Sequence, residues 1–273
     1  MQKKLITRGC FMTSWMKVAS LVTLAGLTAC SASPTGRNQL LLFSDQDMSQ
    51  LGAQSFEQMK AEQPISKDAK TNQYVQCVAN SITQHIPKQG FSEWEVVVFE
   101  SDQVNAFALP GGKIGVYTGL LKVAVNEDQL ATVIGHEIAH VIADHSNERL
   151  SQSQLANTGL QITNVAIGAS EYSQYQGMTM AALGLGVQYG VILPYGRTQE
   201  SEADIVGLDY MAKAGFDPRQ SVNLWQNMAK ASGGNQPPEL LSTHPSHDTR
   251  IKDLQATIKT LPSYGATKPN CKA

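Results

Sequence analysis

One short stretch constrains the structure of this chain more than any other: the segment His-Glu-Ile-Ala-His, which contains His136, Glu137 and His140. Side chains four apart project from one face of a helix, so the two histidines can each direct a ring nitrogen at one ion. Glu137 lies about 100° further around such a helix, beside the ion, where its carboxylate can take a proton from a water. The segment therefore predicts a helix that carries two metal ligands and a base.

A third metal ligand is expected from the segment Glu200-Ser201-Glu202-Ala203-Asp204. Glu200 and Asp204 share a helix face, whereas Glu202 lies about 200° away from Glu200. Glu200 can then bind the ion while Asp204 accepts a hydrogen bond from the second nitrogen of a ligand histidine. Taken alone the segment could be an acidic turn facing solvent, but the nearby His-Glu pattern favours the ligand interpretation. Two histidines and a glutamate suit zinc best.

The pattern along the chain predicts one α+β domain, mostly helical, with a small antiparallel sheet. Between residues 155 and 193 the chain is rich in Gly, Ala, Ser and Gln, which leaves helical packing and a mobile lid both open. Helices are expected over residues 45–60, 68–86 and 196–214, and after Asp217-Pro218. Another helix should run from Glu127, capped by Asn126, past His145. A final helix is expected near the C-terminus, where the apolar residues Ile251, Leu254, Ile258 and Leu261 recur at helical spacing. Strands are expected over 94–99, and over 104–109 and 113–118 as a hairpin around Pro110-Gly111-Gly112.

Charge and hydrophobicity exclude several classes of protein. The 21 Lys and Arg nearly balance the 23 Asp and Glu, which is unlike a strongly basic nucleic-acid-binding protein. Charged residues make up 16% of the chain and hydrophobic residues 42%, which is typical of a globular domain. No uninterrupted apolar run reaches the ~20 residues needed to span a bilayer.

The first 29 residues are interpreted as an export signal. A basic start free of acidic residues precedes an apolar stretch over 18–27, and Leu27-Thr28-Ala29-Cys30 resembles a bacterial lipobox, in which the cysteine is lipidated. An ordinary cleaved signal or an N-terminal anchor are the alternatives, and Met12 or Met16 could be the true start. The lipobox resemblance with Ser31 next implies a lipoprotein at the periplasmic face of the outer membrane. We expect a lipidated tether over 30–44, the main domain over 45–262 and a tail over 263–273.

Two further cysteines, Cys77 and Cys271, are interpreted in the light of this export signal. Disulfides persist in an exported protein, so these residues could join the C-terminal tail to an N-terminal helix. Two unpaired thiols, one in a helix and one on the tail, are equally compatible with the sequence. The oligomeric state is left open.

Four motifs together resemble a known family. His136–His140 and Glu200–Asp204, with Asn105–Gly112 and Thr243-His244-Pro245, are similar to motifs of the gluzincin metallopeptidases, in the membrane-associated group that contains the CAAX prenyl endopeptidase, HtpX and mitochondrial Oma. Residues 36–261 are most similar to its periplasmic branch, with BepA and LoiP. The resemblance implies a zincin-like endopeptidase with one zinc ion per chain, held by His136, His140 and Glu200, with Glu137 as the catalytic base.

Further expectations concern residues outside the metal site, and the resemblance supplies the first of them. Asn105 and Ala106 would hold substrate backbone along an edge strand, although a plain core strand is the alternative. His244 could donate to the oxyanion, could bind zinc as a latent fourth ligand, or could have no catalytic part. Arg250 could pair with a carboxylate of the site or remain solvated. The histidines at 85, 145 and 247 are expected to face solvent.

The family implies proteolytic quality control of misfolded or misassembled proteins of the bacterial envelope. A periplasmic chaperone or assembly factor for outer-membrane proteins, with proteolysis secondary, is the alternative. The complete set of Glu137 and ligands argues against a pure binding protein, since binding alone requires no base. A metal-dependent deformylase lacks support because the chain has no suitable cysteine motif.

Overall fold

The computed structural model describes residues 30–188, 193–231 and 247–272. The predicted signal over 1–29 and the motif Thr243-His244-Pro245 lie outside these residues. The helices are α2 (Asp45–Glu62), α3 (Ala69–Thr83), α4 (Thr118–Leu121), α5 (Glu127–Ile142), α6 (His145–Gly168), α7 (Gln176–Val187), α8 (Leu193–Lys213), α9 (Gln220–Ala231) and α10 (His247–Thr260). The strands are β1 (Cys30–Ala32), β2 (Asn38–Leu40), β3 (Glu95–Phe99), β4 (Ala106–Leu109) and β5 (Lys113–Tyr117).

The described residues confirm a mostly helical α+β fold, with one correction to the sheet. The predicted hairpin is present as β4 and β5, which pair antiparallel on either side of Pro110-Gly111-Gly112. Strand β3 pairs parallel to β5, so the three-stranded sheet is mixed, with the order β3-β5-β4. The chain reverses its direction between β3 and β4, and again at the tight hairpin between β4 and β5. Strand β5 therefore runs in the same direction as β3, and it pairs with β3 because it lies in the middle of the sheet.

Helix α5 begins as the sequence predicts but ends earlier. The side chain of Asn126 accepts a hydrogen bond from the backbone N–H of Gln129 at 2.9 Å, which caps the first turn. The helix ends at Ile142 rather than past His145, because Asp144 takes a left-handed conformation with φ of 52°. Aspartate is among the few residues that adopt this conformation readily, and the chain starts a new helix, α6, at His145.

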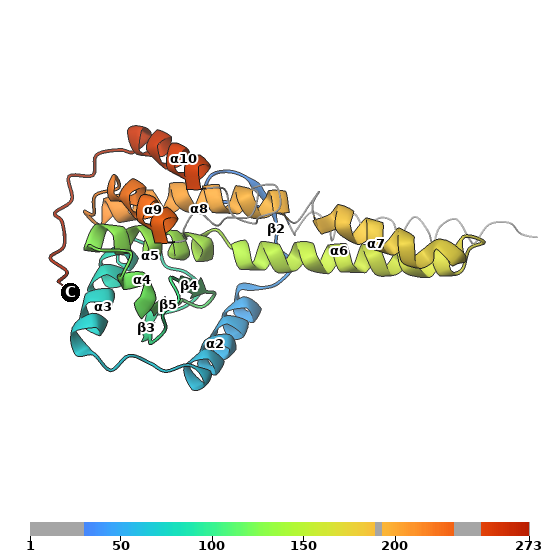
Figure 1. The fold of residues 1–273 in the computed structure, drawn as a ribbon, viewed down its shortest axis with the longest axis horizontal. Helices are drawn as coiled ribbons and strands as arrows, with labels where there is room; N and C mark the ends of the chain where they lie inside the picture. Colours follow the sequence, from blue (N-terminus) through green and yellow to red (C-terminus); the bar gives the residue numbers. More distant parts are fainter. Residues whose placement is uncertain (1–29, 189–192, 232–246, 273) are drawn as a thin grey trace, which may run out of the picture.

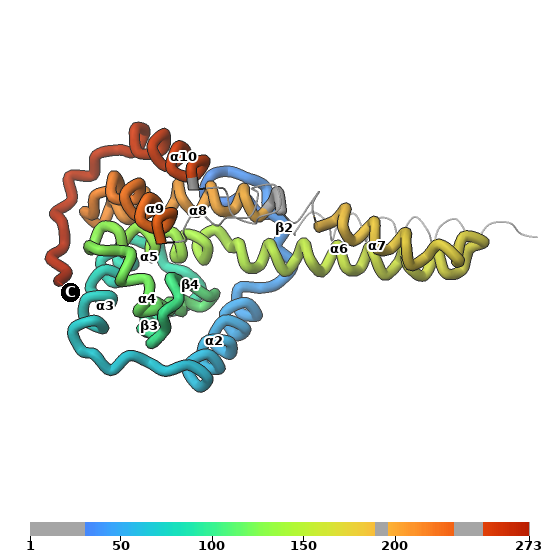
Figure 2. Tube along the Cα trace, viewed as in Figure 1, coloured from blue at the N-terminus to red at the C-terminus, as the bar shows by residue number. Residues whose placement is uncertain are grey.

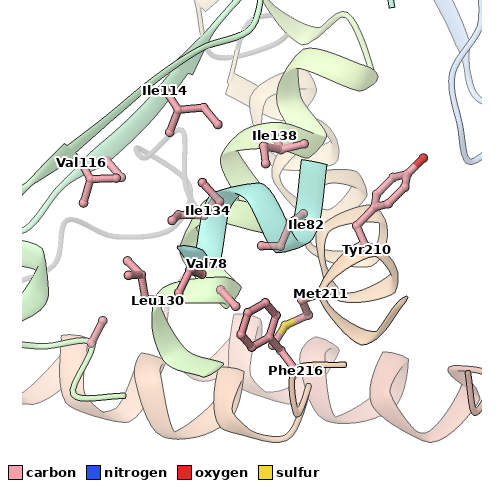
Figure 3. Packing of buried hydrophobic residues seen from close by; sticks show 14 of the residues in the cluster. Val78, Ile82, Ile114, Val116, Leu130, Ile134, Ile138, Tyr210, Met211 and Phe216 are labelled. Carbon is pink, nitrogen blue, oxygen red and sulfur yellow. The ribbon is translucent and has the colours of Figure 1, made fainter. Parts of the chain in front are cut away.

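The core lies where α3, α5 and α8 pack against one another and against the sheet (Figure 3). Helices α5 and α8 approach each other closely at two glycines. A Cβ atom placed on Gly207 of α8 would lie 2.8 Å from the carbonyl carbon of Gly135 and 2.8 Å from the backbone nitrogen of His136. This crossing therefore sets the distance between the two helices that carry the predicted metal ligands. The labelled core side chains in Figure 3 are Val78, Ile82, Ile114, Val116, Leu130, Ile134, Ile138, Tyr210, Met211 and Phe216.

The segment over 155–193 is helical in its described part. Figure 1 shows α6 and α7 side by side as an antiparallel pair that extends away from the rest of the domain. Several apolar side chains of this pair are exposed, among them Leu155, Ile162, Val165, Met178 and Leu185. Among the described residues, no helix combines the length and the apolar character that crossing a membrane requires.

Both ends of the described chain are held against the domain. A disulfide joins Cys77 in α3 to Cys271, and Figure 2 shows the tail after α10, in red, running around the domain towards α3. The segment expected to be a polar tether is partly folded: β1 and β2 pair antiparallel, which brings Cys30 opposite Leu40. We call residues 30–40 the N-terminal hairpin.

Candidate metal centre

The crossing of α5 and α8 brings the three predicted ligands together. Nε2 of His136 lies 3.1 Å from Nε2 of His140. The carboxylate of Glu200 lies 3.3 Å from each of these nitrogens, one oxygen to each. The three ligand atoms all lie within 4.8 Å of one another. Among the described residues, this is the group of histidine, cysteine and acidic side chains that could hold a metal ion.

The chemistry of these donors fits zinc. Two imidazole nitrogens and one carboxylate oxygen from protein, with room for one further ligand, form the usual set of a catalytic zinc site. Burial and the charge of Arg250 lower the pKa of His136, but hydrogen bonds to Asp204 and Glu200 outweigh them and raise it to about 9. The two carboxylates thus favour a positive charge at the position of His136. Burial lowers the pKa of His140 to about 4, which keeps this imidazole neutral at pH 7. A neutral imidazole has the lone pair that a ligand needs.

Behind His136, Asp204 occupies the position expected for it. An oxygen of Asp204 lies 2.9 Å from Nδ1 of His136, opposite the ligand nitrogen. Burial raises the pKa of Asp204, but the charge of Arg250 and the hydrogen bond with His136 outweigh it, and the net pKa is below the usual value. Asp204 thus remains ionised and can hold the His136 ring in one orientation.

Arg250, on α10, is buried inside the site. It donates to Asp204 at 2.6 Å and to Glu200 at 3.3 Å. Its guanidinium carbon lies 3.9 Å from the ring centroid of Trp225, over the ring face. The interpretation that Arg250 pairs with carboxylates of the site is confirmed.

Behind His140 the structure overturns one prediction. His145 was expected to face solvent, but only 1% of its surface is exposed. Its Nδ1 lies 2.8 Å from Nδ1 of His140, and its Nε2 lies 3.2 Å from a carboxylate oxygen of Glu202. The reason is the left-handed turn at Asp144, which ends α5 and places His145, the first residue of α6, next to His140. His85 is exposed, as expected.

Glu202 is a further residue of the site that the sequence pattern did not reveal. It points away from the ligand face of α8, as expected from its position, but it is buried and meets the N-terminal hairpin. Burial raises its pKa, but hydrogen bonds from Ser33, Thr35, His145 and Arg37 lower it to about 2. A possible signal was the polar cluster of Thr35 and Arg37 just after Cys30, which a free tether does not require.

Glu137 and Ala106, the first residue of β4, share a cavity with the ligands His136 and Glu200. The cavity has a volume of about 280 Å³. Glu137 is half-buried, and burial raises the pKa of its carboxyl group above the usual value, while a backbone hydrogen bond from Ala108 lowers it. The cavity is lined by residues that include Asn105, Ala106, His136, Glu137, Glu200 and Arg250. The structure therefore brings the predicted base, ligands and substrate strand together, while His244 lies outside the described residues.

The sequence of the chain is similar to those of known metallopeptidases. Residues 67–258 match peptidase family M48. A mitochondrial metalloendopeptidase OMA1 from Bos taurus is 34% identical over 246 residues, which cover 85% of this chain and 46% of that protein. A beta-barrel assembly-enhancing protease from Yersinia pestis is 30% identical over 216 residues, which cover 77% of this chain and 43% of that protein. The chain thus spans about half the length of these curated relatives.

Proposed function

The chain belongs to peptidase family M48, a family of zinc metallopeptidases, and we propose that it is itself a zinc-dependent endopeptidase that cleaves misfolded or misassembled proteins of the bacterial envelope. One observation carries the catalytic part of this proposal. The ligands His136 and Glu200 line one cavity with Glu137 and with Asn105 and Ala106 at the start of β4, and the ligand atom of His140 lies within 4.8 Å of those of His136 and Glu200. A base, a metal site and a strand able to hold a peptide are the parts that peptide hydrolysis requires.

Zinc held by these three residues would act as a Lewis acid, which polarises a peptide carbonyl and lowers the pKa of a water. Glu137 would take the proton of the attacking water and then give it to the leaving amine. Burial raises its pKa, and a carboxyl group serves better in both transfers when its pKa is closer to the working pH.

Strand β4 supports an endopeptidase rather than an enzyme for small substrates. It is an edge strand of the sheet, and Asn105 and Ala106 line the cavity next to Glu137. An extended peptide could add to this edge through backbone hydrogen bonds, which accept many sequences. Such binding fits substrates that share an unfolded state rather than a sequence motif.

For the location, we propose the periplasmic face of the outer membrane, with a lipid on Cys30 as the anchor, and a place in the periplasmic BepA and LoiP branch of the family. The lipobox-like sequence before Cys30 and the disulfide between Cys77 and Cys271 support an oxidising, extracytoplasmic compartment. Relatives of the chain include both mitochondrial and bacterial proteases. The mass of the acyl-modified N-terminal peptide tests the anchor directly.

A second function has one specific observation in its favour. The α6–α7 pair exposes apolar side chains such as Ile162, Val165 and Met178, and none of the described residues of this pair lines the catalytic cavity. Exposed apolar surface of this kind often binds other proteins. The chain could therefore hold outer-membrane proteins during assembly, with cleavage secondary.

Zinc content and casein cleavage test the catalytic proposal in the wild type, Glu137→Gln and the control Glu171→Gln. Glu171 is an exposed glutamate outside the site, so the control makes the same chemical change without touching the cavity. We expect one zinc per chain in all three proteins, and loss of cleavage only in Glu137→Gln. A wild type that binds no zinc would refute the proposal. Equal rescue of envelope defects in cells by wild type and Glu137→Gln would favour the assembly function.

A further inference from the structure

A continuous chain of hydrogen bonds connects the metal ligand His140 to the N-terminal hairpin. From His140 it passes to His145, and from His145 to Glu202. One oxygen of Glu202 accepts from the backbone N–H and the hydroxyl of Thr35, at 3.2 and 2.7 Å. The other oxygen accepts from Arg37, at 3.1 Å from Nε and 2.9 Å from Nη2. Side chains 167 positions apart in the sequence thus meet behind the ligand.

The hydrogen-bonding groups of this chain fix the direction of each bond. The carboxylate of Glu202 can only accept, so Nε2 of His145 must carry its proton and donate. A neutral imidazole has one N–H, so Nδ1 of His145 is then an acceptor. Nδ1 of His140, which lies 2.8 Å away, must therefore donate. This leaves Nε2 of His140 with a free lone pair on the side of Glu200 and His136.

Arg37 holds this arrangement from the outside. Its guanidinium bridges two buried carboxylates, because it also donates to Glu148 at 2.5 and 2.8 Å. The side chain of Gln39, in the same hairpin, donates at 2.6 Å to the carbonyl oxygen of Ala143, at the end of the metal helix. The hairpin is thus bound both to α8 and to the C-terminal end of α5. Without Arg37, two buried carboxylates would face each other with no cation between them.

We propose that the N-terminal hairpin is a positioning element of the metal site, in which Arg37 and Thr35 hold Glu202, Glu202 fixes the tautomer of His145, and His145 presents the lone pair of His140 to zinc. The inference rests on the zinc site of the proposed function. It adds that zinc affinity depends on residues before the matched family region, which begins at residue 67. The hairpin also begins at Cys30, so the segment that would carry a lipid is the one that supports the ligand.

The matched test compares Arg37→Met with Arg219→Met. Arg219 pairs with Asp217 on the surface, and its side chain is 80% exposed, so the control removes an arginine of equal size without touching the hairpin. The zinc dissociation constant is measured by competition with a chromophoric chelator, and apoprotein stability by thermal unfolding in EDTA. We expect Arg37→Met to bind zinc up to ~10-fold more weakly, the lower end of the usual effect of losing a residue that orients a ligand directly, because Arg37 acts on His140 through Glu202 and His145. Arg219→Met should bind like the wild type.

A purely structural hairpin predicts a different result. It would lower the melting temperature of the apoprotein in Arg37→Met and leave zinc affinity unchanged, and this outcome would overturn the inference. If Arg37→Met does not fold, Thr35→Val removes one hydrogen bond to Glu202 at nearly constant volume, and a several-fold loss of zinc affinity is expected. A wild type without zinc affinity would instead refute the proposed function itself.

The tautomers can be read directly. In protein labelled with ¹⁵N-histidine, long-range ¹H–¹⁵N spectra distinguish a protonated from an unprotonated ring nitrogen, and His145→Phe assigns the His145 signals. The control His85→Phe removes an exposed ring. We expect His145 to be protonated at Nε2 and unprotonated at Nδ1. The opposite tautomer of His145 would refute the chain of hydrogen bonds as described.

Discussion

Replacing one glycine tests how the α5–α8 crossing builds the metal site. In an exposed helix, Gly→Ala stabilises a protein by up to ~1 kcal/mol, because alanine loses less backbone entropy on folding. Gly207 should behave in the opposite way. Its new methyl group would lie 2.8 Å from two backbone atoms of α5, whereas carbon contacts are optimal from about 3.5 Å. The helices would have to separate by ~0.7 Å.

The expected magnitude follows from these opposing terms. Overpacking a well-packed core costs ~1–3 kcal/mol, and the gain in helix propensity offsets ~1 kcal/mol of it. We therefore expect Gly207→Ala to be destabilised by about 1 kcal/mol, which lowers the melting temperature by ~2–4 °C in a domain of this size. Because α5 carries two ligands and α8 carries Glu200, the same displacement should weaken zinc binding.

Gly184→Ala is the matched control, because Gly184 lies within helix α7 and a Cβ atom added there would meet nothing within 4 Å. We expect this variant to melt at or above the wild-type temperature and to bind zinc normally. Thermal unfolding followed by circular dichroism, with and without zinc, measures both effects. If Gly207→Ala were as stable as Gly184→Ala and kept its zinc affinity, the crossing would not set the ligand spacing and the reasoning would be wrong.

Three further predictions follow from the described contacts. Asp204→Asn removes the charge behind His136 and should weaken zinc binding ~10–100-fold in the chelator competition, and an unchanged affinity would show that Asp204 does not orient the ring. Cys271→Ser opens a disulfide with a sequence separation of 194 residues and should lower the free energy of unfolding by ~2–5 kcal/mol in urea, and wild type under reducing conditions should match it. Burial raises the pKa of Glu148, but hydrogen bonds from Arg37 and its neighbours outweigh it and place the folded-state pKa below the usual value. This stabilisation is complete above the unfolded pKa of about 4.3 and is lost as the pH falls below it, so urea titrations should show a smaller loss in this range for Arg37→Met than for the wild type.

Local patterns predicted the parts of the fold that depend on neighbouring residues. Three examples are the capped start of α5, the β4–β5 hairpin and the end of α8 before Gly215, which has φ of 85°. Each follows from turn residues or helical spacing within a short stretch of sequence around the element itself. His136, His140 and Glu200 were found for a related reason, since ligand spacing on a helix is set by its 3.6-residue turn. The parallel pairing of β3 depends on the order of the strands in the sheet, in which β5 and not β4 lies next to β3. No local pattern encodes this order.

The residues behind His140 show why the outer part of the site was missed. His145 and Glu202 are polar, and polar residues on helices are usually solvated, so their sequence pattern predicts a surface. They can be buried because Arg37 and Thr35, far away in sequence, supply the positive charge and the hydrogen-bond donors that offset the free-energy cost of burying a carboxylate. Such compensation arises only when distant segments meet, and a single sequence contains no periodic signal for it.

The disulfide has a consequence for a protease that meets copies of itself. Cys77 and Cys271 close a covalent ring that contains the sheet, both ligand helices and the long α6–α7 pair. A single cut of the backbone anywhere inside this ring leaves the two pieces joined through sulfur. Autolysis in the exposed part of the ring would therefore leave a nicked molecule whose two pieces stay together on a denaturing gel and separate only when a reductant is added.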